Sequence, residues 1–135
     1  MRKRTLAREL ALKALYQHEL RGGVPLEELF PAGATGARAE VYGFARELTE
    51  GCLANRQMLD ELIQRTAENW RLDRMPVIDR NILRIGTYEL IFLEDVPPKV
   101  SINEAIDLAK KYSTADSGAF VNGILDKLRT QIRPE

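Results

Sequence analysis

The chain has few of the residue types on which enzymes and disulfide-stabilised proteins depend. It has one histidine, His18, and one cysteine, Cys52, among its 135 residues. A single cysteine excludes an internal disulfide and is typical of a reducing compartment, so we expect a cytoplasmic location. One histidine and one cysteine also fall short of the usual zinc ligand sets, and nucleophilic catalysis usually needs a histidine beside Ser, Cys or Asp. We therefore expect no enzyme, no bound metal and no cofactor.

Long apolar runs and phosphate-binding glycine motifs are also absent. No segment approaches the roughly 18 consecutive apolar residues of a membrane span, and no apolar signal segment follows the N-terminal arginines, so no membrane association is expected. Neither a glycine-rich dinucleotide fingerprint nor a Walker sequence occurs. Adjacent carboxylates such as Glu27 and Glu28 point apart on a helix, so they indicate solvated faces rather than an acid–base pair.

The chain has no net charge, because 20 Lys and Arg residues balance 20 Asp and Glu residues. The distribution of charge is more informative than the sum. Before the first acid, Glu9, the chain has four cations, which are Arg2, Lys3, Arg4 and Arg8. Such a basic N-terminal arm is typical of a phosphate-binding surface, although a solvated, frayed terminus has the same composition.

Apolar spacing of three and four residues recurs along almost the whole chain, and it predicts an all-α fold of about seven helices. The length suits one domain, residues 1–135, built from two packed helical bundles that cover roughly residues 1–54 and 55–135. The expected helices span residues 4–21, 25–31, 37–54, 56–69, 77–94, 101–113 and 117–131.

Turn and cap residues predict where several helices begin and end. Gly22 suits the left-handed conformation just past a helix end. Pro97-Pro98 interrupts the fifth helix, and the segment Ser101–Glu104 matches a capping box that would begin the sixth. Asp116-Ser117 offers a cap for the seventh helix.

The first and fifth helices have unusual apolar patterns. In the first, one stripe contains Leu6, Leu10 and Ala14, and a second contains Leu12, Tyr16 and Leu20. Two stripes indicate either burial on both sides or one face that is left for a partner. The fifth helix is apolar around much of its circumference, which predicts a central position, with Gly86 at a close helix approach and Glu89 in a hydrogen-bonded structural role.

Three blocks of sequence follow one another at characteristic spacing. The first covers residues 2–16, a basic segment followed by an ARE-x-A-x-x-ALY pattern. The second begins at Asp79-Arg80 and ends at Tyr88-Glu89-Leu90. The third runs from Asp95-Val96-Pro97 through residues 102–105 (INEA) to residues 120–126 (FVNGILD). In this order they resemble the NusB family of bacterial transcription antitermination factors.

The resemblance implies an all-helical fold of two bundles and a role in processive transcription antitermination, including on ribosomal RNA operons. It implies pairing with NusE, which is also a small-subunit ribosomal protein. The heterodimer would bind the boxA element of nascent single-stranded RNA and join the RNA polymerase antitermination complex.

The resemblance also implies two sets of site residues. The expected RNA-binding residues are Arg2, Lys3, Arg4, Arg8, Asp116, Ser117, Phe120 and Asn122. The expected NusE-binding residues are Tyr16, Leu20, Asp79 and Arg84. Structural explanations stay open for three of these residues, because Ser117 also suits a helix cap, Phe120 the core, and Asp79 the first turn of a helix.

The sequence is compatible with two other functions. A NusB-like domain forms the N-terminal part of certain ribosomal RNA cytosine methyltransferases. Besides a domain of this length, those enzymes need a separate catalytic domain. A helical interaction protein that homodimerises through the Leu12, Tyr16 and Leu20 face and binds no RNA is a candidate of a different class. The sequence does not distinguish a free monomer from a homodimer.

Overall fold

The computed structural model describes residues 2–23 and 25–134, and within these ranges the protein is all-helical. The helices are α1 (Lys3–Arg21), α2 (Leu26–Leu29), α3 (Gly36–Ala54), α4 (Arg56–Thr66), a short 3₁₀ helix η1 (Leu72–Arg74), α5 (Val77–Phe92), α6 (Pro98–Tyr112) and α7 (Ser117–Ile132). The prediction of an all-α fold with about seven helices is confirmed for the described ranges. None of these helices combines the length and the apolar character that a bilayer crossing requires.

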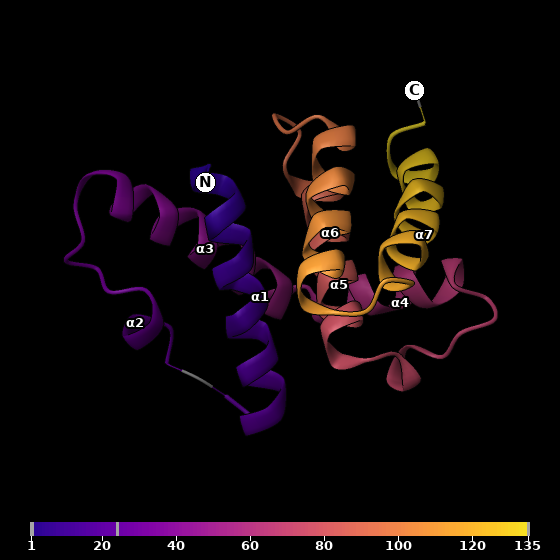
Figure 1. The fold of residues 1–135 in the computed structure, drawn as a ribbon, viewed down its shortest axis with the longest axis horizontal. Coiled ribbons are helices and arrows are strands. Elements are labelled where there is room, and N and C mark those ends of the chain that lie inside the picture. Colours follow the sequence, from indigo (N-terminus) through magenta and orange to yellow (C-terminus); the bar gives the residue numbers. More distant parts are fainter. Residues whose placement is uncertain (1, 24, 135) are drawn as a thin grey trace.

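The helices form two groups that meet at α5 (Figure 1). In the first group α1 packs against α3, and in the second α6 packs against α7, while α5 contacts all four of them as well as α4. Every residue from Asn81 to Leu90 is buried. The fifth helix is therefore central, as its apolar circumference predicted.

Two glycines allow helices to approach α5 closely. A Cβ atom at Gly86 would lie 2.7 Å from Cδ1 of Leu125 on α7, so the prediction of a close helix approach at this position is confirmed. Gly51 has the same function on α3, where a Cβ atom would overlap the ring of Tyr88 on α5.

The predicted capping box at the start of the sixth helix is wrong. Helix α6 begins three residues earlier, with Pro98 in its first turn, because proline has no N–H that needs a partner and its φ is already helical. Ser101 and Glu104 consequently lie inside the helix. Ser101 donates to Glu89 on α5 at 2.7 Å, and Glu104 accepts from Thr5 on α1 at 2.8 Å.

Other helix ends agree with the prediction more closely. Gly22 follows α1 with φ 79°, in the left-handed conformation expected there. Helix α7 begins at Ser117, but Asp116 makes no side-chain hydrogen bond to the helix end, so it is not the predicted cap. Helix α4 ends at Thr66 rather than at residue 69, which places Trp70 in the following turn.

The close packing at Gly51 yields a test of the fold. Gly51→Ala should lower the free energy of unfolding by about 1–3 kcal/mol, because the new methyl group must displace the Tyr88 ring. Gly43→Ala is a matched control on the same helix, where a Cβ atom meets nothing within 4 Å. The control should raise stability by up to about 1 kcal/mol, through helix propensity alone. Urea unfolding of both variants measures the difference, and equal effects would contradict the close approach.

Candidate nucleic-acid interface

The start of α1 forms an exposed basic edge, which we define as Arg2, Lys3 and Arg4. It borders a hollow of about 620 Å³ that is closed on the other side by the segment from Asp95 to Val100. Lys3 lies 2.7 Å from Glu40 and Arg4 lies 3.8 Å from Asp95. Exposed ion pairs of this kind contribute only about 0–1 kcal/mol, so both cations are available to an anionic ligand.

Arg8, the fourth predicted phosphate contact, is not part of this exposed edge. Its side chain is 3% exposed, and its guanidinium donates two hydrogen bonds of 2.8 Å to the Glu89 carboxylate. A third bond of 3.3 Å reaches Glu104. Burial by itself would lower the pKa of Arg8, but the hydrogen bonds and charge of Glu89, with those of Glu104, outweigh it and raise the pKa. Arg8 therefore holds α1 to α5 and α6, and the predicted structural role of Glu89 is confirmed.

At the other end of α6, three of the predicted RNA-binding residues share a cavity of about 390 Å³, which we call the aromatic cavity. Its lining residues are Trp70, Arg74, Met75, Pro76, Asp79, Thr114, Asp116, Ser117 and Phe120. Phe120 is half-buried, and its ring meets the indole of Trp70 edge-on at a centroid distance of 5.7 Å and an interplanar angle of 79°. Phe120 is thus neither a core residue nor a free platform, but one half of an aromatic pair at the cavity wall.

The polar groups at the base of this cavity are bonded to one another. Ser113 donates to Asp79 at 2.6 Å and Ser117 donates to Asp79 at 2.9 Å. Asp79 is 4% exposed and Ser117 is 3% exposed. Both side chains tie the α6–α7 turn to the start of α5, whereas the resemblance implied an RNA contact for Ser117 and a NusE contact for Asp79.

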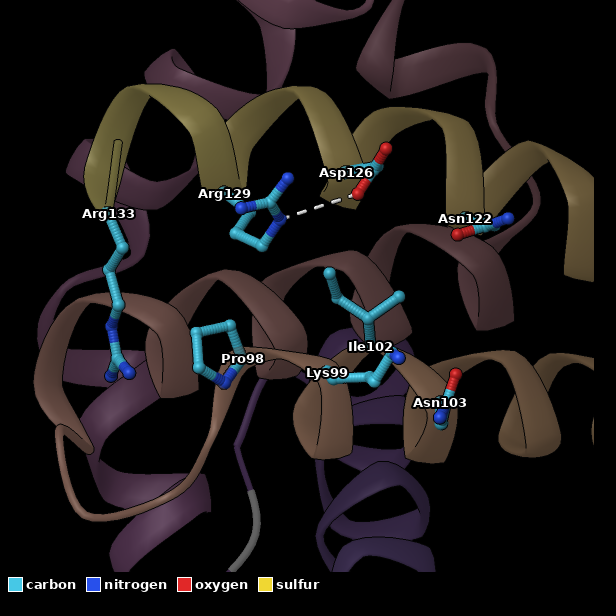
Figure 2. A pocket seen from close by; sticks show the side chains of 8 residues that line it. All are labelled: Pro98, Lys99, Ile102, Asn103, Asn122, Asp126, Arg129 and Arg133. Atoms are coloured by element: carbon cyan, nitrogen blue, oxygen red, sulfur yellow. Dashed lines mark hydrogen bonds and ion pairs between the residues drawn. The ribbon is translucent and has the colours of Figure 1, made fainter. Parts of the chain in front are cut away.

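Asn122 lies apart from the aromatic cavity, in a groove of about 830 Å³ between α6 and α7 (Figure 2). Asn103 stands across this groove from Asn122, and Lys99, Arg129 and Arg133 also line it. Successive helical residues are turned by roughly 100°, so positions 120 and 122 face nearly opposite directions. Apart from the buried Arg8, the residues predicted to bind RNA therefore divide among the basic edge, the groove and the aromatic cavity.

Arg133 is committed to the protein rather than to a ligand in this groove. Its guanidinium donates to the carbonyl oxygens of Leu90, Leu93 and Val96 at 2.8–3.2 Å. Leu90 lies in the last turn of α5, where carbonyl groups have no helical partner, and Leu93 and Val96 lie in the segment that follows the helix. Lys99 and Arg129 are the remaining cations of the groove, and Arg129 lies 3.4 Å from Asp126.

The predicted partner residues also separate into exposed and buried pairs. Tyr16 is 37% exposed and Leu20 is 61% exposed, and we call these two residues the apolar patch. Leu12 of the same stripe is buried in the core. Arg84, in contrast, is 4% exposed and donates to Asp60 at 2.7 and 3.0 Å. Its guanidinium is therefore engaged inside the protein.

A partly buried polar network around Glu19, the residue next to Leu20, was not predicted from the sequence. Glu19 accepts hydrogen bonds from Arg80 and from Arg84, the latter at 2.9 Å. Burial alone would raise the pKa of the Glu19 carboxyl, but the hydrogen bonds from the two arginines lower it below its usual value. The network fixes the end of α1 against the start of α5 and so holds Tyr16 and Leu20 in place. No sequence motif links Glu19 to residues about 60 positions away, so only the fold shows the network.

Together, these features define a helical binding protein with an exposed basic edge, an aromatic cavity and an apolar patch. The model of the NusB family matches residues 5–130. The chain belongs to the NusB family.

Individual relatives are similar to this protein over nearly the whole chain. Over 130 residues the chain is 46% identical to the transcription antitermination protein NusB of Myxococcus xanthus, covering 93% of each chain. It superposes on the structure of T. maritima NusB with a TM-score of 0.84 at 41% identity, covering 97% of this chain and 92% of that one. It also matches a chain in the crystal structure of the antitermination factors NusB and NusE in complex with double-stranded RNA. That match has a TM-score of 0.83 at 32% identity and covers 97% and 98% of the two chains.

The buried pairing of Arg8 leads to a prediction about stability. Arg8→Met should lower the free energy of unfolding by about 3–5 kcal/mol, because it leaves the Glu89 carboxylate buried without its cation. The double variant Arg8→Met/Glu89→Leu should recover much of this loss, since no uncompensated charge is then buried. Urea unfolding of the two variants and of Arg4→Ala, an exposed control, measures these effects. A loss from Arg8→Met no larger than that from Arg4→Ala would show that Arg8 does not have this structural role.

Proposed function

We propose that this protein is a transcription antitermination factor that pairs with NusE and binds boxA-containing RNA as part of an RNA polymerase antitermination complex. The observation that supports this most directly is the nearly full-length similarity to a protein solved together with NusE and RNA. The basic edge supplies the chemistry that RNA binding needs. Three exposed cations at one end of a helix meet phosphates without first breaking a buried interaction.

In this proposal the RNA-facing set is smaller than the one expected from the sequence. Arg2, Lys3 and Arg4 contact phosphates, while Lys99 and Asn122 extend the contact surface along the α6–α7 groove. Arg8 acts only indirectly, because its guanidinium orients the start of α1 from inside the protein. The phosphate contacts supply affinity and position, and base recognition must come from other groups.

The RNA proposal is tested by fluorescence anisotropy with a labelled boxA RNA in the presence of NusE, at several salt concentrations. Arg2→Ala/Lys3→Ala/Arg4→Ala should weaken binding and reduce the slope of log affinity against log salt by up to about 2, because up to three phosphate contacts are lost. The control Arg38→Ala/Arg65→Ala/Lys127→Ala removes the same charge from exposed positions elsewhere.

Three comparisons decide this experiment. A scrambled RNA should bind more weakly than boxA, and single-stranded and double-stranded forms of boxA show which form is preferred. If the triple variant of the basic edge (Arg2→Ala/Lys3→Ala/Arg4→Ala) and the control variant bind RNA alike, the basic edge does not bind RNA. If the unmodified protein with NusE binds boxA and scrambled RNA equally, or neither of them, the antitermination proposal fails.

We further propose that the apolar patch docks NusE. Tyr16 and Leu20 expose apolar surface above the Glu19 network, which keeps the patch rigid. Asp79 and Arg84 then contribute by holding α5 beneath the patch, rather than by direct contact. A rigid apolar surface with an aromatic residue is typical of the energetic centre of a protein interface.

The docking proposal predicts opposite behaviour for two substitutions at one position. Leu20→Asp should weaken NusE binding about tenfold or more, because a charge would enter an apolar contact. Leu20→Met keeps the apolar volume and should bind NusE like the unmodified protein. Isothermal titration calorimetry measures both affinities, and thermal unfolding should show that neither variant is destabilised, since Leu20 is largely exposed. Full NusE affinity in Leu20→Asp would exclude the patch as the docking surface.

A further inference from the structure

The segment between α5 and α6, residues 93–97, forms part of the hollow beside the basic edge. Asp95, Val96 and Pro97 line this hollow on the side opposite the basic edge. The N–H of Val96 donates to the Leu93 carbonyl at 3.0 Å and closes a single turn. Pro97 has no N–H that would add to this bonding. The position of the segment therefore depends on groups from other parts of the fold.

Arg133, directly after the end of α7, binds this segment from outside, and its side chain extends away from α7 (Figure 2). Its Nε donates to the Leu90 carbonyl at 2.9 Å. Its two terminal nitrogens donate to the carbonyls of Leu93 and Val96 at 2.8 and 3.2 Å. A guanidinium is planar and presents its donors in a fixed fork, so these bonds set the position of the segment relative to α5.

The two sides of the hollow are held by adjacent residues of α5. The Glu89 carboxylate accepts from Arg8 on α1 at 2.8 Å, which holds the side that carries the basic edge. The Leu90 carbonyl accepts from Arg133 at 2.9 Å, which holds the other side. Between the two sides, the exposed ion pair of 3.8 Å at the rim contributes little. The width of the hollow is therefore set by these two arginines, which come from opposite ends of the chain.

Arg133 also lines the α6–α7 groove, but its nitrogens are engaged by the protein. A phosphate bound to this guanidinium would compete with the backbone carbonyls of the segment. If those bonds were absent, RNA that entered the hollow would have to order residues 93–97, at an entropic cost for each residue that it fixed. Arg133 orders the segment before the RNA arrives.

We propose that Arg133 is a positioning residue for RNA binding, which contacts no RNA but holds residues 93–97 so that the hollow beside the basic edge is ready for a phosphate. This inference rests on the proposed RNA-binding function. It deepens that function by assigning a residue after the last helix to the site at the first helix. Preorganisation of this kind raises affinity without adding a contact.

The first test measures the affinity of Arg133 variants for labelled boxA RNA by anisotropy, with NusE, at several salt concentrations. Arg133→Met should weaken binding about tenfold, and Arg133→Lys, which keeps a donor for the carbonyls, should weaken it less. The slope of log affinity against log salt should not change, whereas loss of a direct phosphate contact would reduce it by about 1. Lys127→Met removes a cation from an exposed position on α7 and should bind RNA like the unmodified protein.

A double-mutant cycle separates positioning from a general structural defect. In the triple variant of the basic edge, Arg133→Met should weaken RNA binding by no more than about twofold, because the cations that face the segment are already absent. A general defect would weaken binding by the same factor in both backgrounds. Circular dichroism checks that the variants are folded, and Arg133→Lys replaces Arg133→Met in the cycle if the latter is not.

Hydrogen exchange measured by NMR without RNA reports on the segment itself. The Val96 amide should exchange about tenfold faster in Arg133→Met, because the turn that it closes is no longer held. Gly51→Ala is a control that lowers stability through the packing of α3 on α5. It should leave both the Val96 exchange rate and the RNA affinity close to those of the unmodified protein.

The alternative outcomes separate this inference from the proposed function. If Arg133→Met binds RNA normally while the triple variant of the basic edge does not, the positioning role is excluded and the RNA-binding function stands. A reduced salt slope in Arg133→Met, or equal losses in both backgrounds of the cycle, would also overturn the inference. If the unmodified protein with NusE binds no RNA, both proposals fail.

Discussion

The buried ion pair between Arg8 and Glu89 is the interaction on which the arrangement of this protein depends. It joins α1 to the central helix α5, and the hydroxyl of Ser101 and the carboxylate of Glu104 extend it to α6. Removing two charges from water costs several kcal/mol for each ion, so the pair is tolerated only where hydrogen bonds satisfy both groups. Within the described ranges every buried side-chain nitrogen and oxygen has a hydrogen-bond partner. The start of α1 is thereby fixed beside the start of α6, and the basic edge takes its place from this contact.

Most of the helices were predictable because apolar spacing and chain-breaking residues are local signals. Gly22 ends α1 for a reason that depends only on its own backbone, with φ 79°. The capping box failed because a local alternative, Pro98 in the first helical turn, competed with it, and because the partner of Ser101 is Glu89 on another helix. The burial of Arg8 was missed for a related reason. A run of positive residues does not reveal that a carboxylate 81 positions away pairs with one of them. The resemblance predicted which residues bind RNA and NusE, but only the packing distinguishes the exposed residues from the buried ones.

The two ends of α6 differ in what they offer a ligand. The basic edge borders the same hollow as the start of α6, and the aromatic cavity is lined by the α6–α7 turn. Figure 1 shows these two segments at opposite ends of α6. A helix of 15 residues separates them by roughly 22 Å. The α6–α7 groove, with Lys99 and Asn122, is lined on α6 by residues 98–103, so it covers the first part of this helix (Figure 2). An RNA strand that reached both ends would meet three exposed cations at the first and an aromatic pair at the second. The apolar patch lies near the aromatic end, because Glu19 is bonded there to Arg80 at the start of α5.

The absence of net charge is compatible with binding a polyanion, because the relevant charges act over short distances. Mobile ions screen interactions beyond about 10 Å at moderate salt, so a phosphate responds to the few charges beside it rather than to the sum over the chain. The internal networks engage more carboxylates than guanidinium groups. The carboxylates are Glu9, Glu19, Asp60, Asp79, Glu89 and Glu104, and the guanidinium groups are Arg8, Arg80 and Arg84. Carboxylates without a guanidinium partner accept from other groups. Asp79 accepts from the hydroxyls of Ser113 and Ser117. Glu9 accepts from Lys111 and from the hydroxyl of Tyr112. Of these six carboxylates, Glu104 lines the hollow beside Arg2, Lys3 and Arg4, where it accepts from Arg8 and Thr5. Folding therefore draws more carboxylates than guanidinium groups into internal hydrogen bonds, and the acids beside the basic edge, Glu40 and Asp95, form only exposed ion pairs with it.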